Sequence, residues 1–83
     1  MRVTIRLFAR LREIAGTGEL ALDVEAPATI GTIWAELIAA HPGLAPYASS
    51  ISAARNMDYA RMDAAVAEND EIAFLPPVSG GAI

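Results

Sequence analysis

The sequence predicts a single α+β domain, in which a mixed sheet of about four to five strands packs against one main helix. Strand-like alternation of apolar and polar residues occurs over residues 2–8 and again over 71–75. Between these segments, residues 30–38 carry one apolar stripe at helical spacing. A chain of 83 residues has room for one domain. Two layers are expected, because the sheet and the helix each need to cover one apolar side.

The first part of the predicted sheet is a pair of strands joined through a short helix. Apolar side chains fall at alternate positions in residues 2–8 and in 19–25, which is typical of half-buried strands. The segment 9–15 between them suits a short helix that stops at Gly16. We therefore expect the two strands to pair in antiparallel fashion.

The main helix is expected to begin after Thr29, whose side chain suits the N-cap position. The apolar stripe follows the i, i+3, i+4, i+7, i+8 pattern and consists of Ile30, Ile33, Trp34, Leu37 and Ile38. Pro42 and Gly43 end the helix, because proline cannot continue it and glycine accommodates the reversal of the chain. The stripe, including Trp34, is predicted to lie in the core.

The C-terminal half is predicted to add short strands that are separated by turns. The segments are a loop at 44–50, a strand at 51–57, a tight turn at 56–58, a short return through Tyr59, a turn at Asn69-Asp70 and the last strand at 71–75. Pro76 and Pro77 end all regular pairing, because neither residue can donate a backbone hydrogen bond.

The two most apolar strands are the first and the last of the chain. In ubiquitin-like β-grasp folds these two strands lie side by side and parallel at the centre of the sheet. This chain fits that arrangement. We therefore expect a β-grasp domain over residues 1–75 and an extended tail over 76–83.

Composition narrows the classes of function. The net charge of −4 argues against a nucleic-acid partner, which requires a basic face. The chain has no cysteine, which excludes a disulfide framework, a thiolate metal site and a cysteine nucleophile. His41 has no nucleophile paired with it, so no catalytic role is expected. The scattered carboxylates have no metal-ligand spacing, so we predict no metal site and expect surface charges at Asp23, Glu25, Asp58, Asp63, Glu68, Asp70 and Glu71.

The expected location is the cytoplasm. The apolar stretches are short and interrupted, which predicts no membrane span. The first residues, 1–6, alternate like a strand and contain no signal-peptide core.

The end of the chain has the properties of a reactive tip on a stiff stalk. Pro76 and Pro77 favour an extended exit from the globule. Gly80 and Gly81 lack Cβ atoms, so they fit a narrow channel and let catalytic groups of a partner approach the backbone. A terminal carboxylate joined to AMP becomes a good electrophile, which a persulfide donor can convert to a nucleophilic thiocarboxylate. By itself, however, the pair Gly-Gly is a weak signal and is more typical of a flexible tail or linker.

Two segments together resemble the MoaD family, the small subunit of molybdopterin synthase. The first is Asn69-Asp70-Glu71-Ile72-Ala73-Phe74-Leu75-Pro76-Pro77-Val78-Ser79-Gly80-Gly81. The second is Leu7-Phe8-Ala9-Arg10-Leu11-Arg12-Glu13-Ile14-Ala15-Gly16, which is similar to the first strand and helix of that family. The resemblance covers nearly the whole chain.

The resemblance implies a carrier that is not catalytic by itself and binds no cofactor, apart from a transient AMP adduct at its C-terminus. Gly81 would be adenylated by an E1-like enzyme of the MoeB type and then thiocarboxylated. The tail would enter the large subunit, MoaE, and sulfur would pass to cyclic pyranopterin monophosphate to form the dithiolene of molybdopterin. The assembly implied is a heterotetramer with one carrier at each end of a large-subunit dimer. The residues expected to line the channel are Pro76, Pro77, Val78, Ser79 and Gly80.

Two departures from the family pattern stand at the ends of the C-terminal motif. Asn69 replaces the usual glycine, which is mild because asparagine also tolerates turn conformations. Ala82 and Ile83 follow the diglycine, so the carbonyl of Gly81 is an amide that cannot be adenylated. Removal by a protease, a fragment or fusion remnant, and loss of activity are all open explanations.

The predicted partner interface consists of Phe8, Leu75, Arg10 and Arg12. If Ile72 and Phe74 face the helix, Leu75 faces outward beside Phe8 and forms an exposed apolar patch next to the root of the tail. The alternative for the two apolar residues is partial burial at irregular strand ends. The alternative for Arg10 and Arg12 is that they are solvated helix residues.

Other functions stay open at this stage. A sulfur carrier for another pathway, such as the thiazole of thiamine or a tungsten enzyme, has the same tail chemistry. A protein modifier would join Gly81 to lysines. A β-grasp binding module would need no tail chemistry at all.

Overall fold

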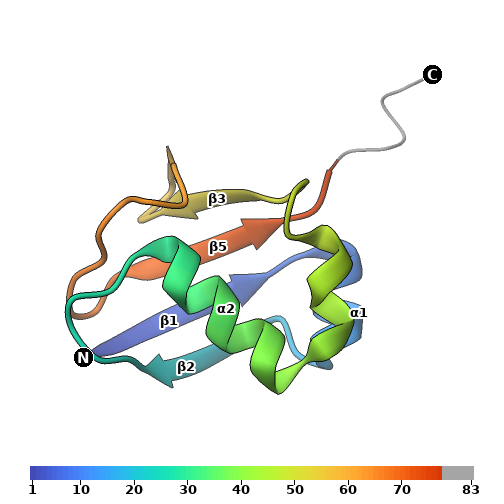
Figure 1. Cartoon of the computed structure of the whole chain (residues 1–83), viewed down its shortest axis with the longest axis horizontal. Coiled ribbons are helices and arrows are strands. Elements are labelled where there is room, and N and C mark those ends of the chain that lie inside the picture. Colours follow the sequence, from blue (N-terminus) through green and yellow to red (C-terminus); the bar gives the residue numbers. More distant parts are fainter. Residues whose placement is uncertain (78–83) are drawn as a thin grey trace.

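The computed structural model describes residues 1–77, which form one mixed sheet with a helical layer on one face (Figure 1). The elements are β1 (Arg2–Leu7), α1 (Ala9–Ala15), β2 (Glu19–Asp23), α2 (Ile30–Ala40), the 3₁₀-helix η1 (Pro42–Tyr47), β3 (Ser52–Arg55), β4 (Asp58–Ala60) and β5 (Glu71–Leu75). The strand order in the sheet is β2-β1-β5-β3-β4. The predicted two-layer architecture is therefore confirmed.

The first and last strands, β1 and β5, lie parallel at the centre of the sheet. In their register Ile5 is opposite Ile72, and Leu7 is opposite Phe74. β2 pairs with β1, and β3 pairs with β5, both in antiparallel fashion. This is the predicted β-grasp arrangement. Because β1 and β5 run in the same direction, their C-terminal ends reach the same edge of the sheet.

Both predicted helices begin and end close to the expected residues. α1 stops at Gly16, which adopts the left-handed conformation with φ 79° that glycine accommodates without strain. At the start of α2, the backbone N–H of Thr32 donates to Oγ1 of Thr29 at 3.2 Å. In return, the backbone N–H of Thr29 donates to Oγ1 of Thr32 at 2.9 Å, which completes a capping box. The N-cap prediction for Thr29 is therefore confirmed.

The core lies between α2 and the inner face of the sheet. Its fully buried side chains alternate along β1 and β5, as the strand pattern predicts, and the stripe on α2 covers them. Trp34 of α2 packs on Phe74 of β5, with their ring centroids 4.9 Å apart. In the described residues, no helix has the length and apolar character that a membrane crossing requires.

The structure differs from the sequence prediction between α2 and β4. The loop predicted at 44–50 is wrong in its first half, because residues 42–47 form η1, which starts at a proline and buries Leu44. The strand predicted over 51–57 covers only residues 52–55. It ends there because Asn56 and Met57 have positive φ angles and form the two-residue turn that leads into β4.

Asp70 is not the surface charge that the sequence suggested, since its exposed fraction is only 8 %. Its carboxylate accepts hydrogen bonds from Nδ2 of Asn56 at 3.0 Å and from the backbone N–H of Ala67 at 2.8 Å. Nη1 of Arg55 lies 3.6 Å from Oδ2. The carboxylate therefore ties the β3–β4 turn to the start of β5.

The same contacts set the ionisation of this carboxyl group. Burial, the largest single influence, raises the pKa of Asp70, but the hydrogen bonds from Asn56 and Ala67 and the charge of Arg55 together outweigh it. The pKa of Asp70 is therefore lower in the folded chain than its ordinary value of 3.8. Ionised Asp70 thus stabilises the fold above that ordinary pKa, and this stability is lost as the pH falls through the folded pKa.

The substitution Asp70→Asn is expected to reduce the free energy of unfolding at pH 7 by about 1–3 kcal/mol, because it leaves a buried donor without its acceptor. The difference from the wild type should shrink as the pH falls below 4. Urea unfolding at pH 7, 5 and 3 measures both effects. The matched control is Asp58→Asn, since Asp58 is exposed. Equal loss of stability in both variants at pH 7 would contradict a specific role of Asp70.

Candidate functional site

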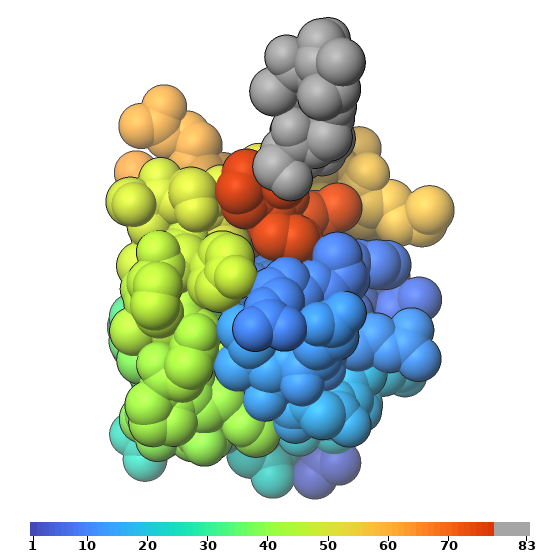
Figure 2. Space-filling model, turned by 90° about the vertical axis from the view of Figure 1, so that its right-hand side faces the viewer, coloured from blue at the N-terminus to red at the C-terminus, as the bar shows by residue number. Residues whose placement is uncertain are grey.

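The tail leaves the globule at the end of the central strand β5. The last described residues, Pro76 and Pro77, are half-buried and exposed, respectively. Figure 2 shows this segment, in red, emerging from the molecule above the blue N-terminal segment. Since Leu7 is opposite Phe74, the next residue of the N-terminal segment, Phe8, comes beside Leu75. The parallel pairing therefore brings Phe8 to the root of the tail.

Phe8 and Leu75 line one groove on the outer face of the sheet, of about 320 Å³. We call it the apolar groove, and it is lined by Phe8, Ala54, Met57, Tyr59, Ala73 and Leu75. Ala54 and Ala73 are opposite each other in neighbouring strands, and their small side chains leave the groove open. The predicted neighbourhood of Phe8 and Leu75 is thus present, in a larger surface than the sequence indicated.

Three side chains that line the apolar groove are unusually exposed for large apolar residues, whereas Leu75 is half-buried. The exposed fractions are 39 % for Phe8, 85 % for Tyr59 and 89 % for Met57. Exposed aromatic and methionine side chains around a groove are typical of protein-binding surfaces. Met57 and Tyr59 were not predicted as site residues, because their nearness to Leu75 depends on which strand pairs with β5.

The predicted interface cations Arg10 and Arg12 differ in their surroundings. Nη1 of Arg10 lies 2.8 Å from Oε1 of Glu13. The hydrogen bond with Glu13 and, to a smaller extent, that with Tyr47 raise the pKa of Arg10 above its ordinary value. Arg12 is exposed, and its side chain lies over Gly18. The charge of Arg10 is therefore already balanced within the chain.

Arg6, which sequence analysis did not single out, stands next to the apolar groove. Its guanidinium carbon lies 5.7 Å from the ring centroid of Phe8. Its nitrogens lie 3.4 Å from a carboxylate oxygen of Glu71 and 3.9 Å from one of Glu19. Arg6 therefore supports the ring of Phe8 while its charge is shared with two carboxylates.

The tail residues expected to react or to line a channel lie beyond Pro77, outside the described residues. They are Val78, Ser79, Gly80 and Gly81, followed by Ala82 and Ile83. Within residues 1–77, no group of three His, Cys, Asp or Glu side chains is placed to hold a metal ion. His41 is half-buried at the C-terminal end of α2. Its backbone N–H donates a hydrogen bond of 2.7 Å to the carbonyl oxygen of Leu37.

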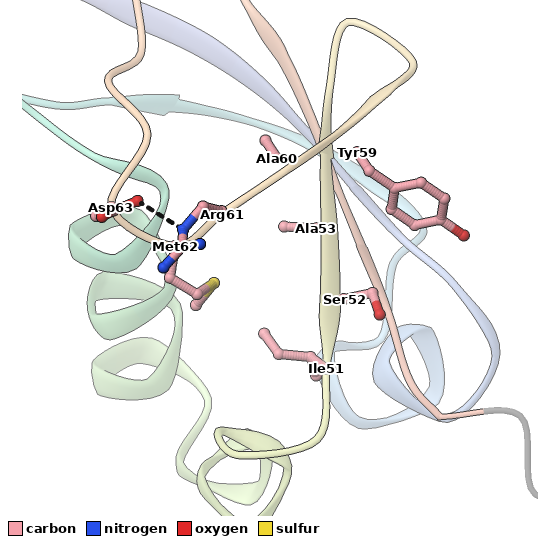
Figure 3. Close-up of a pocket in the computed structure, with 8 residues that line it drawn as sticks. All are labelled: Ile51, Ser52, Ala53, Tyr59, Ala60, Arg61, Met62 and Asp63. Carbon is pink, nitrogen blue, oxygen red and sulfur yellow. Dashed lines mark ion pairs between the residues drawn. The ribbon is translucent and has the colours of Figure 1, made fainter.

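A second groove, of about 560 Å³, opens near the start of β3 (Figure 3). Its lining residues are Ile51, Ser52, Ala53, Tyr59, Ala60, Arg61, Met62 and Asp63. Arg61 and Asp63 form an exposed ion pair at 3.6 Å on its rim. The lining contains no nucleophile paired with a base, so its composition does not support catalysis.

The chain is similar in sequence to a known protein family and to several proteins of known name. The ThiS family profile matches residues 5–81, so the match ends at the second glycine of the tail. Small archaeal modifier protein 1 of Haloferax volcanii is 38% identical over 84 residues, which cover 92% of this chain and 97% of that protein. A molybdopterin synthase sulfur carrier subunit of Chlamydomonas reinhardtii is 35% identical over 83 residues, with 98% of this chain and 100% of that protein covered.

Solved structures have the same fold. The crystal structure of small archaeal modifier protein 1 from Haloferax volcanii matches with a TM-score of 0.87 and 36% identity, over 98% of this chain and 100% of that one. A chain from a complex of subunits 1 and 2 of molybdopterin-converting factor from Helicobacter pylori matches with a TM-score of 0.68 and 21% identity, over 98% of this chain and 100% of that one. The latter likeness concerns the fold alone. The profile match over most of the chain, together with these relatives, shows that the chain belongs to the ThiS family and is a ubiquitin-like sulfur carrier of the ThiS/MoaD type.

Proposed function

We propose that this chain is the sulfur carrier subunit of a molybdopterin synthase and that Gly81 carries the sulfur as a thiocarboxylate. The observation that carries the proposal is the family match that runs through the diglycine and ends at Gly81. Relatives of nearly equal length named molybdopterin synthase sulfur carrier subunits support the choice of pathway. The carrier contributes the acyl group, and partner enzymes contribute the catalytic groups.

The sequence of steps follows from the chemistry of the chain end. Because Gly81 is joined to Ala82, a peptidase first adds water across that amide and releases the residues that follow. The carboxylate of Gly81 then attacks the α-phosphate of ATP, and pyrophosphate leaves. A persulfide sulfur displaces AMP to form an acyl disulfide, and a thiol reductant cleaves its S–S bond to leave the thiocarboxylate.

Two partners are required by this scheme. An E1-like adenylating enzyme of the MoeB type activates Gly81, and a MoaE-like large subunit receives the tail and binds cyclic pyranopterin monophosphate. The apolar groove suits the docking of such a partner, because it is exposed and lies at the root of the tail. The relatives named as sulfur carrier subunits of molybdopterin synthase support a partner of this kind, because a subunit by name works with another subunit.

The proposal predicts that a chain ending at Gly81 becomes heavier by the replacement of one oxygen with sulfur. The chain is incubated with the MoeB-type enzyme, ATP and a persulfide donor, and its intact mass is measured. The matched control is the full chain ending at Ile83, which should remain unchanged, because the carbonyl of Gly81 is then an amide. An unchanged mass of the Gly81-terminated chain would overturn the proposal.

Protein modification is the second candidate function, favoured by the 38% identity to small archaeal modifier protein 1. In that case the activated Gly81 would be transferred to lysine amines of other proteins. Mass spectrometry of conjugates in extract of the source cells separates the two functions. Peptides with a lysine-linked diglycine derived from this chain would support the modifier, and molybdopterin loss in a deletion strain would support the carrier.

A further inference from the structure

Arg12 stands apart from the other arginines of this chain in its electrostatic surroundings. Within residues 1–77, the other five arginines each lie within 4 Å of a carboxylate oxygen, in pairs of Arg2 with Asp23, Arg6 with Glu19 and Glu71, Arg10 with Glu13, Arg55 with Asp70 and Arg61 with Asp63. No such pair includes Arg12 in this part of the chain. Its guanidinium therefore keeps its charge and its donors available for another molecule.

The side chain of Arg12 rests on a glycine that leaves room for it. A Cβ atom at Gly18 would lie 3.2 Å from both Cδ and Nε of Arg12 and 3.4 Å from Cζ. Real Cβ contacts are rarely so tight, so a larger residue at position 18 would require the Arg12 side chain to shift by a few tenths of an ångström. The carbonyl of Gly18 accepts a hydrogen bond from the backbone N–H of Leu7 at 2.9 Å. This bond holds Gly18, and with it Arg12, at the end of β1.

Arg12 and Gly18 both line a polar cleft of about 280 Å³. The polar cleft is lined by Arg6, Leu7, Phe8, Arg12, Gly18 and Glu19. Two guanidinium groups face one carboxylate there, and Arg6 is already shared between Glu19 and Glu71. Arg12 is therefore the guanidinium of this cleft that has no carboxylate partner in the described residues, and an anionic group of another molecule can bind to it.

Phe8 connects this cleft with the proposed partner surface, because the same ring lines both the polar cleft and the apolar groove. A protein that inserts an apolar side chain between Phe8 and Tyr59 thus brings its neighbouring residues over Arg12. A carboxylate is the group that matches a single exposed guanidinium at a protein interface.

We propose that Arg12, seated on Gly18, binds a carboxylate of the protein partner whose apolar side chain occupies the apolar groove. The inference rests on the proposed function and adds the chemistry of the docking partner to it. The partner presents an apolar residue and an acidic residue on opposite sides of the Phe8 ring. Arg12 then selects the partner and its orientation, and takes no part in the sulfur chemistry.

The experiment measures the dissociation constant of the complex with the MoaE-like large subunit, at low and at high salt, for the chain ending at Gly81. Arg12→Gln is expected to weaken binding about tenfold at low salt and to reduce the salt dependence. Arg2→Gln is the matched control and should change binding less than about threefold, because Arg2 is also exposed but is already paired with Asp23 at the N-terminal end of β1, away from Phe8.

A charge reversal identifies the partner group. Arg12→Glu is combined in turn with a lysine at each acidic surface residue of the large subunit, and one combination should restore binding. Equal dissociation constants for Arg12→Gln and Arg2→Gln would overturn the inference. If the two dissociation constants are equal but the Gly81-terminated chain is still thiocarboxylated, the proposed sulfur-carrier function stands and only the role of Arg12 fails. If the wild-type chain is neither thiocarboxylated nor bound by the large subunit, both fail.

Discussion

A chain that ends at Ser79 is expected to fold normally and to lose all sulfur transfer. The reacting carboxylate of Gly81 and the slim approach through Gly80 are both removed, whereas the buried core found in the described residues ends at Phe74. Without an acyl group in the active site of the adenylating enzyme, no adenylate and no thiocarboxylate can form. The expected loss of molybdopterin synthesis in a complementation assay is therefore complete.

The control for this truncation is the chain that ends at Gly81, which should complement fully. Thermal unfolding of both chains should give the same midpoint within about 2 °C, because both retain every core residue of the described part of the chain. A strain that carries only the chain ending at Ser79 and still makes molybdopterin would rule out the sulfur-carrier function. It would favour a binding module that needs no tail chemistry.

The substitution Phe74→Ala is expected to lower the free energy of unfolding by about 3–5 kcal/mol. Phe74 is fully buried in the central strand β5 and packs on Trp34 of α2, so its removal leaves a cavity between the two layers. A domain of this size has a total stability of about 5–15 kcal/mol, so the variant should be close to unfolding at growth temperature. Denaturation in urea measures the change.

The matched control is Met57→Ala, because Met57 is also a large apolar residue but is 89 % exposed. Its free energy of unfolding should stay within about 0.5 kcal/mol of the wild type. The two variants should therefore separate stability from docking, since Met57 lines the apolar groove and Phe74 does not. A similar loss of stability in both variants would show that the core is not where the structure places it.

Local patterns in the sequence were sufficient to predict the fold. Alternation in residues 2–8 and 71–75, and the stripe on residues 30–38, identify which side chains are buried, because burial follows the period of each element. The cap at Thr29 and the stop at Gly16 depend only on residues within one turn of the helix, so they too were predictable. The 3₁₀-helix η1 was missed, because its residues carry prolines that are equally typical of a loop.

Only the part of the candidate site formed by the two central strands was predictable, because the β-grasp fold class already implies that these strands are neighbours. The parallel pairing of β1 and β5 places Phe8 beside Leu75, and alternation along β5 turns Leu75 outward. Met57 and Tyr59 could not be added from the sequence. Their position depends on the pairing of β3 with β5 and on the turn at Asn56.

The sequence by itself determined the main strands, the two α-helices, the apolar side chains of the core and the chemistry that a diglycine tail can support, because these properties depend on local spacing and residue type. Only the tertiary structure decided the state of individual charges. Asp70 is buried because Asn56 and Arg55, from another strand and turn, close over it. Arg10 is paired and Arg12 is not, although both lie on the exposed side of α1, because Glu13 is within reach of Arg10 and Gly18 leaves room beneath Arg12. Ion pairs and contacts of this kind depend on distances across the fold, which no local pattern contains.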